Sequence, residues 1–311
     1  MAIDQILIEA GPGETRIALL EGGRLRELMV TRPDERSVVG NVYLGRVERV
    51  MPGIAAAFVD IGLPRAGFLS LAEARPTGQA AGGTATPAAD GIADYVSEGD
   101  AVLVQVQRDA VADKGVKLTT RIGLTGHALV LLPDAAQIML SRRIVGEAER
   151  DRLKALLGRL AQDAEGLILR SAGMDAAAEV LRRELETLRR IWRTLQDRRR
   201  NARPPICLLS EPPPARRALR DEAGPEVRRV VVEGRRTLAD LVAFCREQAP
   251  ALEAKLQGHA EDVPLFEAFH VEEQIEAALG ERVALPSGGS LIIQPTATLT
   301  AIDVNTGGHA E

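Results

Sequence analysis

The sequence holds few of the residues that build disulfide frameworks and the commoner metal sites. It has two cysteines in 311 residues, Cys207 and Cys245, and neither belongs to a Cys-x-x-Cys pair. This argues against a disulfide scaffold and against a tetrahedral zinc site, so both thiols are expected to be reduced and buried. The chain also lacks a glycine-rich nucleotide loop, a nucleophilic triad and a Cys/His cluster, which removes the support for those functional classes.

Long apolar runs are missing as well. No run approaches the roughly 18 residues of a membrane span, and the first residues lack the basic and apolar segments of a secretory leader. We therefore expect a cytoplasmic protein without a membrane span. Its 45% hydrophobic and 27% charged residues are ordinary for a globular protein, and its length allows two to four modules.

Turn residues and changes of periodicity divide the chain into β-rich and helical parts. Residues 6–30 have the pattern of a strand meander, and glycines spaced through residues 38–69 favour a small closed barrel. Residues 75–93 are rich in Gly, Ala, Thr and Pro and predict a flexible loop. Further strands are expected at 101–108, 116–120, 166–170, 230–233, 291–293 and 299–304, and helices from about 145, at 176–200, at 238–256 and at 267–279.

Aromatic residues are only 3% of the chain, yet four of them lie in or beside the predicted barrel: Tyr43, Phe58, Phe68 and Tyr95. They could simply fill a small barrel. On its surface they would instead stack on unpaired bases, which contributes roughly 1 to 3 kcal/mol per base. Lys114, Lys117 and Arg121 follow nearby; each could be a solvated rim residue, but together with the aromatic residues they favour RNA.

Basic residues are concentrated between positions 101 and 203, where 20 basic and 13 acidic side chains occur, although the whole chain has a net charge of −5. Arg142-Arg143 and Arg170-Ser171 are candidate phosphate ligands, because a guanidinium donates two hydrogen bonds and a hydroxyl can add a third. Each pair alone also occurs by chance in an arginine-rich chain. The arginines of residues 176–200 are interpreted as a solvated face interlaced with Glu184 and Glu186.

The last strand carries the strongest candidate for catalysis. Asp303 lies between Ile302 and Val304 in an apolar strand, and Asn305 and glycines follow. We expect this strand to be buried and its carboxylate to hold Mg²⁺, which keeps several waters and needs only one or two carboxylates. Bound there, Mg²⁺ would neutralise a scissile phosphate and activate water, and Asn305 would orient the carboxylate.

Eight short stretches, in this order, closely resemble the bacterial ribonuclease E/G family, whose members are single-strand-specific endoribonucleases of RNA processing and decay. They are residues 56–62, 67–69, 113–115 with 118–120, 141–144, 166–173, 264–266, 285–290 and 300–305. The resemblance covers essentially the whole chain.

The resemblance implies a multidomain α/β (α+β) fold. Its parts are an RNase-H-like domain with an inserted OB barrel and a 5′-phosphate sensor, and then the start of a DNase-I-like catalytic domain. The expected boundaries are 1–34 for the first RNase-H-like part, 35–125 for the barrel of the ribosomal S-one type, 126–213 for the sensor region, 214–279 for the second RNase-H-like part and 280–311 for the incomplete DNase-I-like start.

The resemblance also assigns roles to residues. Phe58, Phe68 and Lys114 would contact RNA. Arg170 and Ser171 would bind a 5′ phosphate in a pocket shaped by Gly126, Val130 and Arg143. Asp303 would be one of two Mg²⁺-binding aspartates, with Asn305 beside it. The family's second catalytic aspartate, and the cysteine motif that holds zinc between subunits, would lie beyond Glu311.

The sequence therefore predicts a Mg²⁺-dependent endoribonuclease that leaves 5′-phosphate products. This chain is expected to bind single-stranded RNA but to be catalytically incomplete, and the full-length protein could form a homo-oligomer. Two alternatives stay open: a non-catalytic RNA-binding protein that uses the barrel, and a structural adaptor without salt-dependent affinity for RNA.

Overall fold

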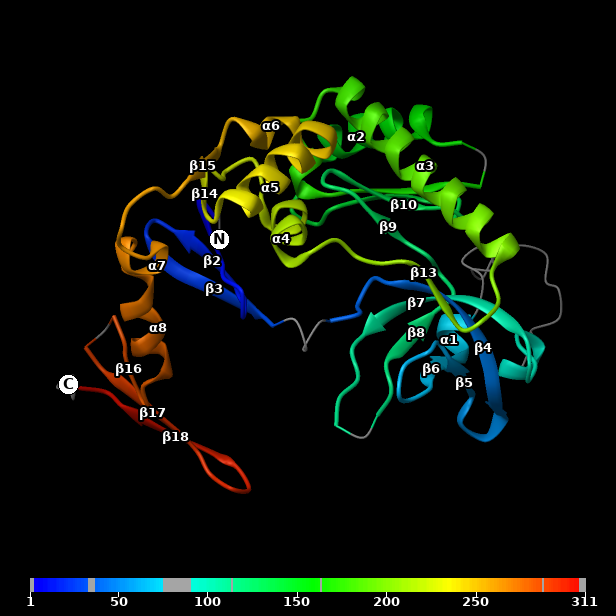
Figure 1. The fold of residues 1–311 in the computed structure, drawn as a ribbon, viewed down its shortest axis with the longest axis horizontal. Helices are drawn as coiled ribbons and strands as arrows, with labels where there is room; N and C mark the ends of the chain where they lie inside the picture. The colour runs from blue at the N-terminus through cyan, green and yellow to red at the C-terminus, as the bar shows by residue number, and fades with distance from the viewer. Residues whose placement is uncertain are drawn as a thin grey trace. The chain divides into compact units, whose positions relative to one another are not determined.

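The computed structural model describes residues 3–32, 37–74, 91–112, 114–162, 164–286 and 288–307 (Figure 1). The chain forms two compact units. Unit 1 comprises Met1–Arg32, Glu226–Ala243 and Ala251–Glu311, and unit 2 comprises Pro33–Pro225 and Phe244–Pro250. Residues 75–90 of the predicted flexible loop lie outside the described residues. The end of that stretch differs from the prediction, because Ile92–Asp94 form a short 3₁₀ helix, η2, in which Ile92 is buried.

Unit 1 contains a five-stranded mixed sheet in the order β15-β14-β1-β2-β3. Strand β1 pairs antiparallel with β2 and parallel with β14, which pairs parallel with β15. Gly22 and Gly23, with φ of 58° and 79°, form the two-residue turn between β2 and β3, as expected for a tight hairpin. The strands are β1 (Gln5–Ala10), β2 (Thr15–Glu21), β3 (Arg24–Thr31), β14 (Arg229–Glu233) and β15 (Leu256–Gly258).

Short helices complete the core of unit 1. Phe266 is fully buried with Leu7, Leu20 and Val271, and the Arg16 guanidinium lies 4.6 Å from the centre of the Phe266 ring. The helix predicted at 267–279 is two helices, because His270 takes a left-handed conformation with φ of 54°. The helices from this part of the chain are α5 (Arg235–Gln248), α6 (Pro250–Glu253), α7 (Leu265–Ala268) and α8 (Val271–Leu279).

The predicted barrel is present in unit 2. Five strands pair in the order β4-β5-β6-β8-β7, and β7 pairs back with β4, so the barrel is closed and fits an OB fold. Glycine permits the close approach of strands. A Cβ on Gly67 would lie 2.4 Å from Leu118 Cδ1, and one on Gly115 would lie 2.0 Å from the Ala66 carbonyl oxygen. The strands are β4 (Val42–Met51), β5 (Ala56–Asp60), β6 (Gly67–Ser70), β7 (Ala101–Arg108) and β8 (Lys117–Thr119).

A second sheet in unit 2 has the order β11-β12-β10-β9 and packs against two helices (Figure 1). The long helix α3 buries Leu181, Leu185, Leu188 and Leu195, as its leucine periodicity predicted. The elements are β9 (Leu124–Thr125), β10 (Leu129–Leu132), β11 (Ile138–Leu140), α2 (Glu147–Leu160), β12 (Gly166–Leu169) and α3 (Ala178–Asn201).

Five short elements complete unit 2. Strand β13 (Ile206–Leu209) pairs with β4 of the barrel, and α4 (Pro214–Glu222) buries Ala218, Leu219 and Arg220. The other three are α1 (Leu71–Ala74) and the 3₁₀ helices η1 (Pro52–Ile54) and η3 (Ser171–Gly173). Among the described residues, no helix has the length and apolar character needed to span a membrane.

The last strands form a separate three-stranded sheet in the order β16-β17-β18. The expectation of a buried final strand is wrong: all six residues of β18 are exposed, and Ile302 and Val304 are 63% and 61% exposed. The strand pairs along one edge with β17, and the side chains on both of its faces are exposed. The strands are β16 (Arg282–Ala284), β17 (Ser290–Pro295) and β18 (Thr300–Asn305).

Candidate functional site

The barrel presents a pair of aromatic side chains on its outer face. Phe58 on β5 lies directly opposite Phe68 on β6, and their ring centres are 6.0 Å apart in an edge-to-face arrangement. Both residues are partly exposed, whereas their neighbours Ala57, Val59 and Leu69 are buried in the barrel. Because side chains alternate along a strand, the two phenylalanines point outward and do not fill the barrel.

Lys114 differs from the neighbouring basic residues in its contacts. Its backbone N–H donates to the Val111 carbonyl at 3.0 Å in the β7–β8 connection. Its side chain is exposed and makes no ion pair with a described residue. Lys117 and Arg121, in contrast, lie 3.9 and 2.7 Å from the carboxylate of Glu73. Lys114 is therefore the cation of this group that is available to a phosphate.

Arg170 lies at the end of β12, where the structure joins it to Gly126. Its Nη1 donates to the carbonyl oxygens of Gly126 at 2.7 Å and of Arg220 at 3.0 Å. Its Nη2 lies 3.3 Å from the Asp221 carbonyl, and Nη1 also lies 3.0 Å from Asp221 Oδ1. The guanidinium is thus oriented by a turn on one side and by the carboxyl end of α4 on the other.

Two of the other predicted phosphate-site residues lie at an adjoining turn. The hydroxyls of Ser171 and Ser141 are 3.5 Å apart, and the backbone N–H of Arg143 donates to Ser141 Oγ at 3.3 Å. The Arg143 side chain is exposed. Val130 lies on β10 and pairs with Ile168 of β12. Ile168 comes two residues before Arg170 in the sequence. The structure therefore brings Gly126, Arg170 and Ser171 into one region, with Val130 in the adjoining sheet and Arg143 at its exposed rim.

The interpretation of Glu184 as a solvated surface charge is wrong. Its side chain is 8% exposed, and its carboxylate accepts the backbone N–H groups of Ala128 and Leu129. A Cβ on Gly126 would lie 2.0 Å from Glu184 Oε1, so a larger residue there would displace this carboxylate. Burial raises the pKa of Glu184 to about 7, although the backbone hydrogen bonds lower it. The position of Glu184 beside Leu185 on the apolar face of α3 was the signal for burial.

The arginines of α3 are also not uniformly solvated. The side chain of Arg189 is 11% exposed and lies 2.7 Å from Glu165, and it donates to the Leu160 carbonyl at 2.8 Å. Arg198 donates to the Leu208 carbonyl at 3.0 Å. These two arginines tie α3 to neighbouring segments, while Arg193, Arg199 and Arg200 are exposed as expected.

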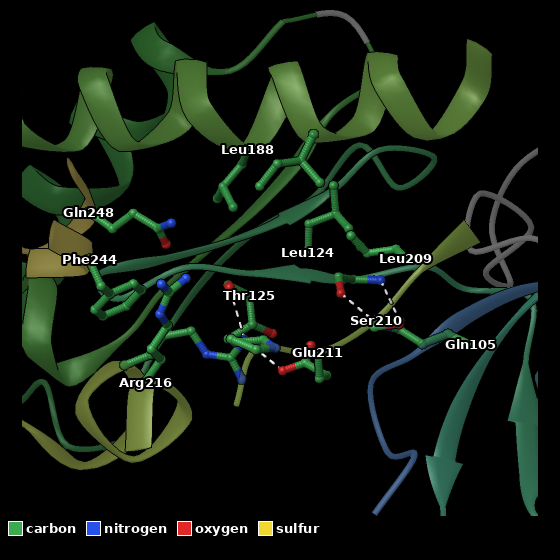
Figure 2. Close-up of a pocket in the computed structure, with 14 residues that line it drawn as sticks. Gln105, Leu124, Thr125, Leu188, Leu209, Ser210, Glu211, Arg216, Phe244 and Gln248 are labelled. Carbon is green, nitrogen blue, oxygen red and sulfur yellow. Dashed lines mark hydrogen bonds and ion pairs between the residues drawn. The ribbon is translucent and has the colours of Figure 1, made fainter. Parts of the chain in front are cut away.

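A pocket of about 270 Å³ lies between α3, β9, α4 and the end of α5 (Figure 2). Figure 2 shows Arg216 next to Phe244 on one side and Ser210 near Gln105 on the other; the Arg216 guanidinium is 6.0 Å from the centre of the Phe244 ring. Arg220, which lines the pocket, is 8% exposed and pairs with Glu211 at 2.7 Å. The sequence did not indicate this pocket, because its walls come from distant segments.

Asp303 and Asn305 lie together on β18. The Asn305 amide donates to Asp303 Oδ2 at 3.0 Å, and both side chains are exposed. One carboxylate held by an amide suits part of the oxygen shell of Mg²⁺, which uses one or two protein carboxylates. Within the described ranges, however, no three residues of the types His, Cys, Asp and Glu are grouped as a metal site would need.

The closed barrel with outward aromatic residues and the adjoining arginine site are parts of a mixed α/β protein. Residues 123–311 match the ribonuclease E/G family, and the chain belongs to that family. It is 37% identical over 305 residues to Ribonuclease G of Escherichia coli strain K12, and 38% identical to Ribonuclease G of Haemophilus influenzae. It is 34% identical over 302 residues to Ribonuclease E of Escherichia coli strain K12.

The alignments cover most of this chain but only part of each relative. They include 97% of the chain and 62% of both Ribonuclease G proteins, and 94% of the chain and 28% of Ribonuclease E. The chain therefore spans about three-fifths of the length of the Ribonuclease G relatives.

Proposed function

We propose that these 311 residues provide the RNA-binding part and one metal-binding carboxylate of a Mg²⁺-dependent endoribonuclease. The enzyme acts on single-stranded RNA and leaves a 5′ phosphate on its product. The observation that carries the proposal is the outward Phe58–Phe68 pair on a closed barrel, in a chain that belongs to the ribonuclease E/G family. In this proposal the protein is cytoplasmic and takes part in RNA processing.

The domain assignment belongs to the same proposal. The order β15-β14-β1-β2-β3, with two antiparallel and two parallel pairings, supports an RNase-H-like sheet. This sheet combines strands from residues 5–31 and 229–258, which supports an inserted barrel and sensor. The DNase-I-like assignment of residues 280–311 rests on the family resemblance and on the β16–β18 sheet.

RNA binding would use the outer face of the barrel. Phe58 and Phe68 would stack on unpaired bases, since a base in a duplex is not available for stacking on a side chain. Lys114 would neutralise a phosphate of the same strand. Selection of single-stranded RNA follows from this geometry, because only unpaired bases can stack on the two rings. The rings accept bases of any sequence.

Asp303 would supply one carboxylate to Mg²⁺, and Asn305 would hold that carboxylate through the 3.0 Å hydrogen bond between their side chains. Bound Mg²⁺ supplies charge neutralisation at a phosphate and lowers the pKa of a water molecule. A single carboxylate gives weak affinity, so we expect the 311 residues to bind RNA and to cleave it slowly.

Arg170 and Ser171 would bind the terminal phosphate of the RNA. The guanidinium is oriented by Gly126, and the hydroxyl of Ser171 lies beside the turn that carries Arg143. A terminal monophosphate has more charge and one more accessible oxygen than an internal phosphodiester, so a fixed guanidinium next to a hydroxyl suits it well. Val130 would form part of the floor of this site.

The test is an assay of Mg²⁺-dependent cleavage of an unstructured RNA, with the ends of the products identified. We expect slow cleavage that leaves 5′-phosphate products and is abolished by Asp303→Asn. Asp134→Asn, at an exposed carboxylate of unit 2, is the control and should cleave like the unchanged chain. Equal cleavage by the Asp303→Asn variant would contradict the catalytic assignment.

A non-catalytic RNA-binding protein is the second candidate. The full exposure of β18 and the lack of a three-residue acidic cluster among the described residues favour it. It predicts tight binding of single-stranded RNA, and no cleavage at any Mg²⁺ concentration even when a segment that supplies a second carboxylate is added.

A further inference from the structure

We propose that Asp221, at the carboxyl end of α4, is a positioning residue for Arg170 and thereby sets the preference for RNA with a 5′ monophosphate. This inference rests on the 5′-phosphate site proposed above. Asp221 is not among the residues that the family resemblance assigns to that site, and it lies 51 positions from Arg170 in the sequence.

The first argument is how Arg170 is held. Its Nη1 has three acceptors within 3.0 Å: the carbonyl oxygens of Gly126 and Arg220 and the Asp221 carboxylate. Its Nη2 is near the Asp221 carbonyl at 3.3 Å. No described residue accepts from its Nε. One edge of the guanidinium is therefore committed to the protein, and the edge with Nε is left to a ligand.

The second argument is that the Asp221 carboxylate is itself fixed. Arg220 donates to it through Nε at 3.0 Å and through Nη2 at 2.9 Å, in a two-point pair. Although burial raises the pKa of Asp221, the hydrogen bonds and charges of Arg220 and Arg170 lower it below its ordinary value. Asp221 is thus an ionised carboxylate in contact with Arg170 and Arg220, and Arg217 Nε lies further off, 3.8 Å from its Oδ2.

The third argument is the anchor of Arg220. Its guanidinium pairs with Glu211 at 2.7 Å in the wall of the pocket of Figure 2, and it lies 3.5 Å from the Thr125 carbonyl. The charges therefore alternate in the order Arg170, Asp221, Arg220 and Glu211. Such an alternating row restricts each side chain to one orientation.

A fixed Asp221 has a consequence for selectivity. The carboxylate, which Arg170 shares with Arg220, offsets part of the charge of Arg170, so an internal phosphodiester with one charge gains less binding free energy there. A terminal phosphate with nearly two charges gains more binding free energy, and the Nε edge of the guanidinium is already oriented towards it. Removing the carboxylate leaves Arg170 held by carbonyls alone. The guanidinium is then less well oriented, and the preference for a terminal phosphate over an internal phosphodiester declines.

The experiment measures equilibrium binding of two single-stranded RNAs of one sequence, with a 5′-monophosphate or a 5′-hydroxyl end. The proteins are the unchanged 311-residue chain, Asp221→Ala, Asp221→Asn, Arg170→Ala and the double variant Arg170→Ala/Asp221→Ala. The readout is the ratio of the two affinities, because a merely structural defect would lower both affinities together.

We expect Asp221→Ala to reduce this ratio about tenfold, as for loss of a hydrogen bond to a charged group. Asp221→Asn keeps an acceptor for Arg170 and should give an intermediate ratio. Arg170→Ala should remove the preference, and the double variant should lose nothing further, because Asp221 acts through Arg170. Asp134→Ala, at an exposed carboxylate of the same unit, should keep the full ratio.

The failures can be told apart. No preference in the unchanged chain, or a preference that survives Arg170→Ala, would overturn the phosphate site and the inference with it. If Arg170→Ala removes the preference but both Asp221 variants keep it, the site stands and the role of Asp221 is refuted. Tighter binding of monophosphorylated RNA by Asp221→Ala would also refute it, because Asp221 would then be a competitor of the phosphate.

Discussion

Glu184 accepts the backbone N–H of Ala128 at 2.9 Å, although the two residues are 56 positions apart in the sequence. Through this bond and a second one at 3.2 Å from the Leu129 N–H, helix α3 holds the turn that begins at Gly126. The same turn gives Arg170 its shortest hydrogen bond, at 2.7 Å to the Gly126 carbonyl. The buried carboxylate of Glu184 therefore stabilises the turn that orients Arg170 in the proposed phosphate site.

The first prediction concerns pH. Because the pKa of Glu184 is raised from 4.5 to about 7 on folding, its proton stabilises the folded state fully below pH 4.5. That contribution is lost as the pH rises towards 7, and the shift limits it to about 3 kcal/mol. We expect the free energy of unfolding of the unchanged chain, measured with urea, to fall between pH 5 and pH 7.5.

Glu184→Gln removes the titrating group, so this variant should lack that part of the slope. The carboxylates whose pKa values are lowered, such as Asp221 and Glu165, lose their contribution at more acidic pH and do not obscure the comparison. Identical slopes for the two proteins between pH 5 and pH 7.5 would show that Glu184 does not titrate there.

The second prediction concerns Gly115, which permits the close approach of two barrel segments. A Cβ at this position would lie 2.0 Å from the Ala66 carbonyl oxygen, which is backbone and cannot rotate away. Gly115→Ala should lower the free energy of unfolding by about 1 to 3 kcal/mol. Gly53→Ala is the matched control, since nothing lies within 4 Å of its Cβ. Equal stability of the two variants would contradict the barrel packing.

The third prediction concerns Lys114 and salt. If its side chain neutralises one phosphate of single-stranded RNA, Lys114→Ala should reduce the slope of log affinity against log salt by about 0.7. Lys154→Ala, at an exposed lysine of α2, should leave the slope unchanged. The measurement is a salt titration of binding to a short unstructured RNA. A lower affinity at every salt concentration with an unaltered slope would place Lys114 outside the phosphate contacts.

The elements predicted well are those whose pattern is local. The leucines of α3 repeat along one face from Leu181 to Leu195, and two adjacent glycines, Gly22 and Gly23, mark the hairpin turn. The barrel was also predicted, from the glycines spaced through residues 38–69. These features depend on neighbours in the sequence, so the sequence is sufficient to find them.

The elements that were missed depend on distant partners. Strands β9, β11, β13 and β15 have two to four residues each, too few for a periodic pattern, and they form by pairing with strands elsewhere in the chain. Burial of Glu184 depends on a turn 56 residues away. The exposure of β18 could not be read from its apolar sequence, because burial depends on what covers a strand.

The candidate site shows the same division. The residues expected at the phosphate site were named from motifs, and the structure brings Gly126, Arg170 and Ser171 together. Asp221 and Arg220, which orient Arg170, belong to no motif and were found only from their contacts. Whether Phe58, Phe68, Lys114 and Asp303 have the roles assigned to them stays a prediction.

The most direct test of the central claim is equilibrium binding of an unstructured RNA and of the same sequence as a duplex. The proteins are the unchanged chain, Phe58→Ala, Phe68→Ala and the control Val145→Ala. Val145 is an exposed apolar residue away from the barrel strands. We predict that each phenylalanine variant loses about 1 to 3 kcal/mol of affinity for the unstructured RNA. Val145→Ala should lose none, and duplex binding should be weak throughout. Full affinity in both phenylalanine variants would contradict the account of the barrel as the RNA-binding surface.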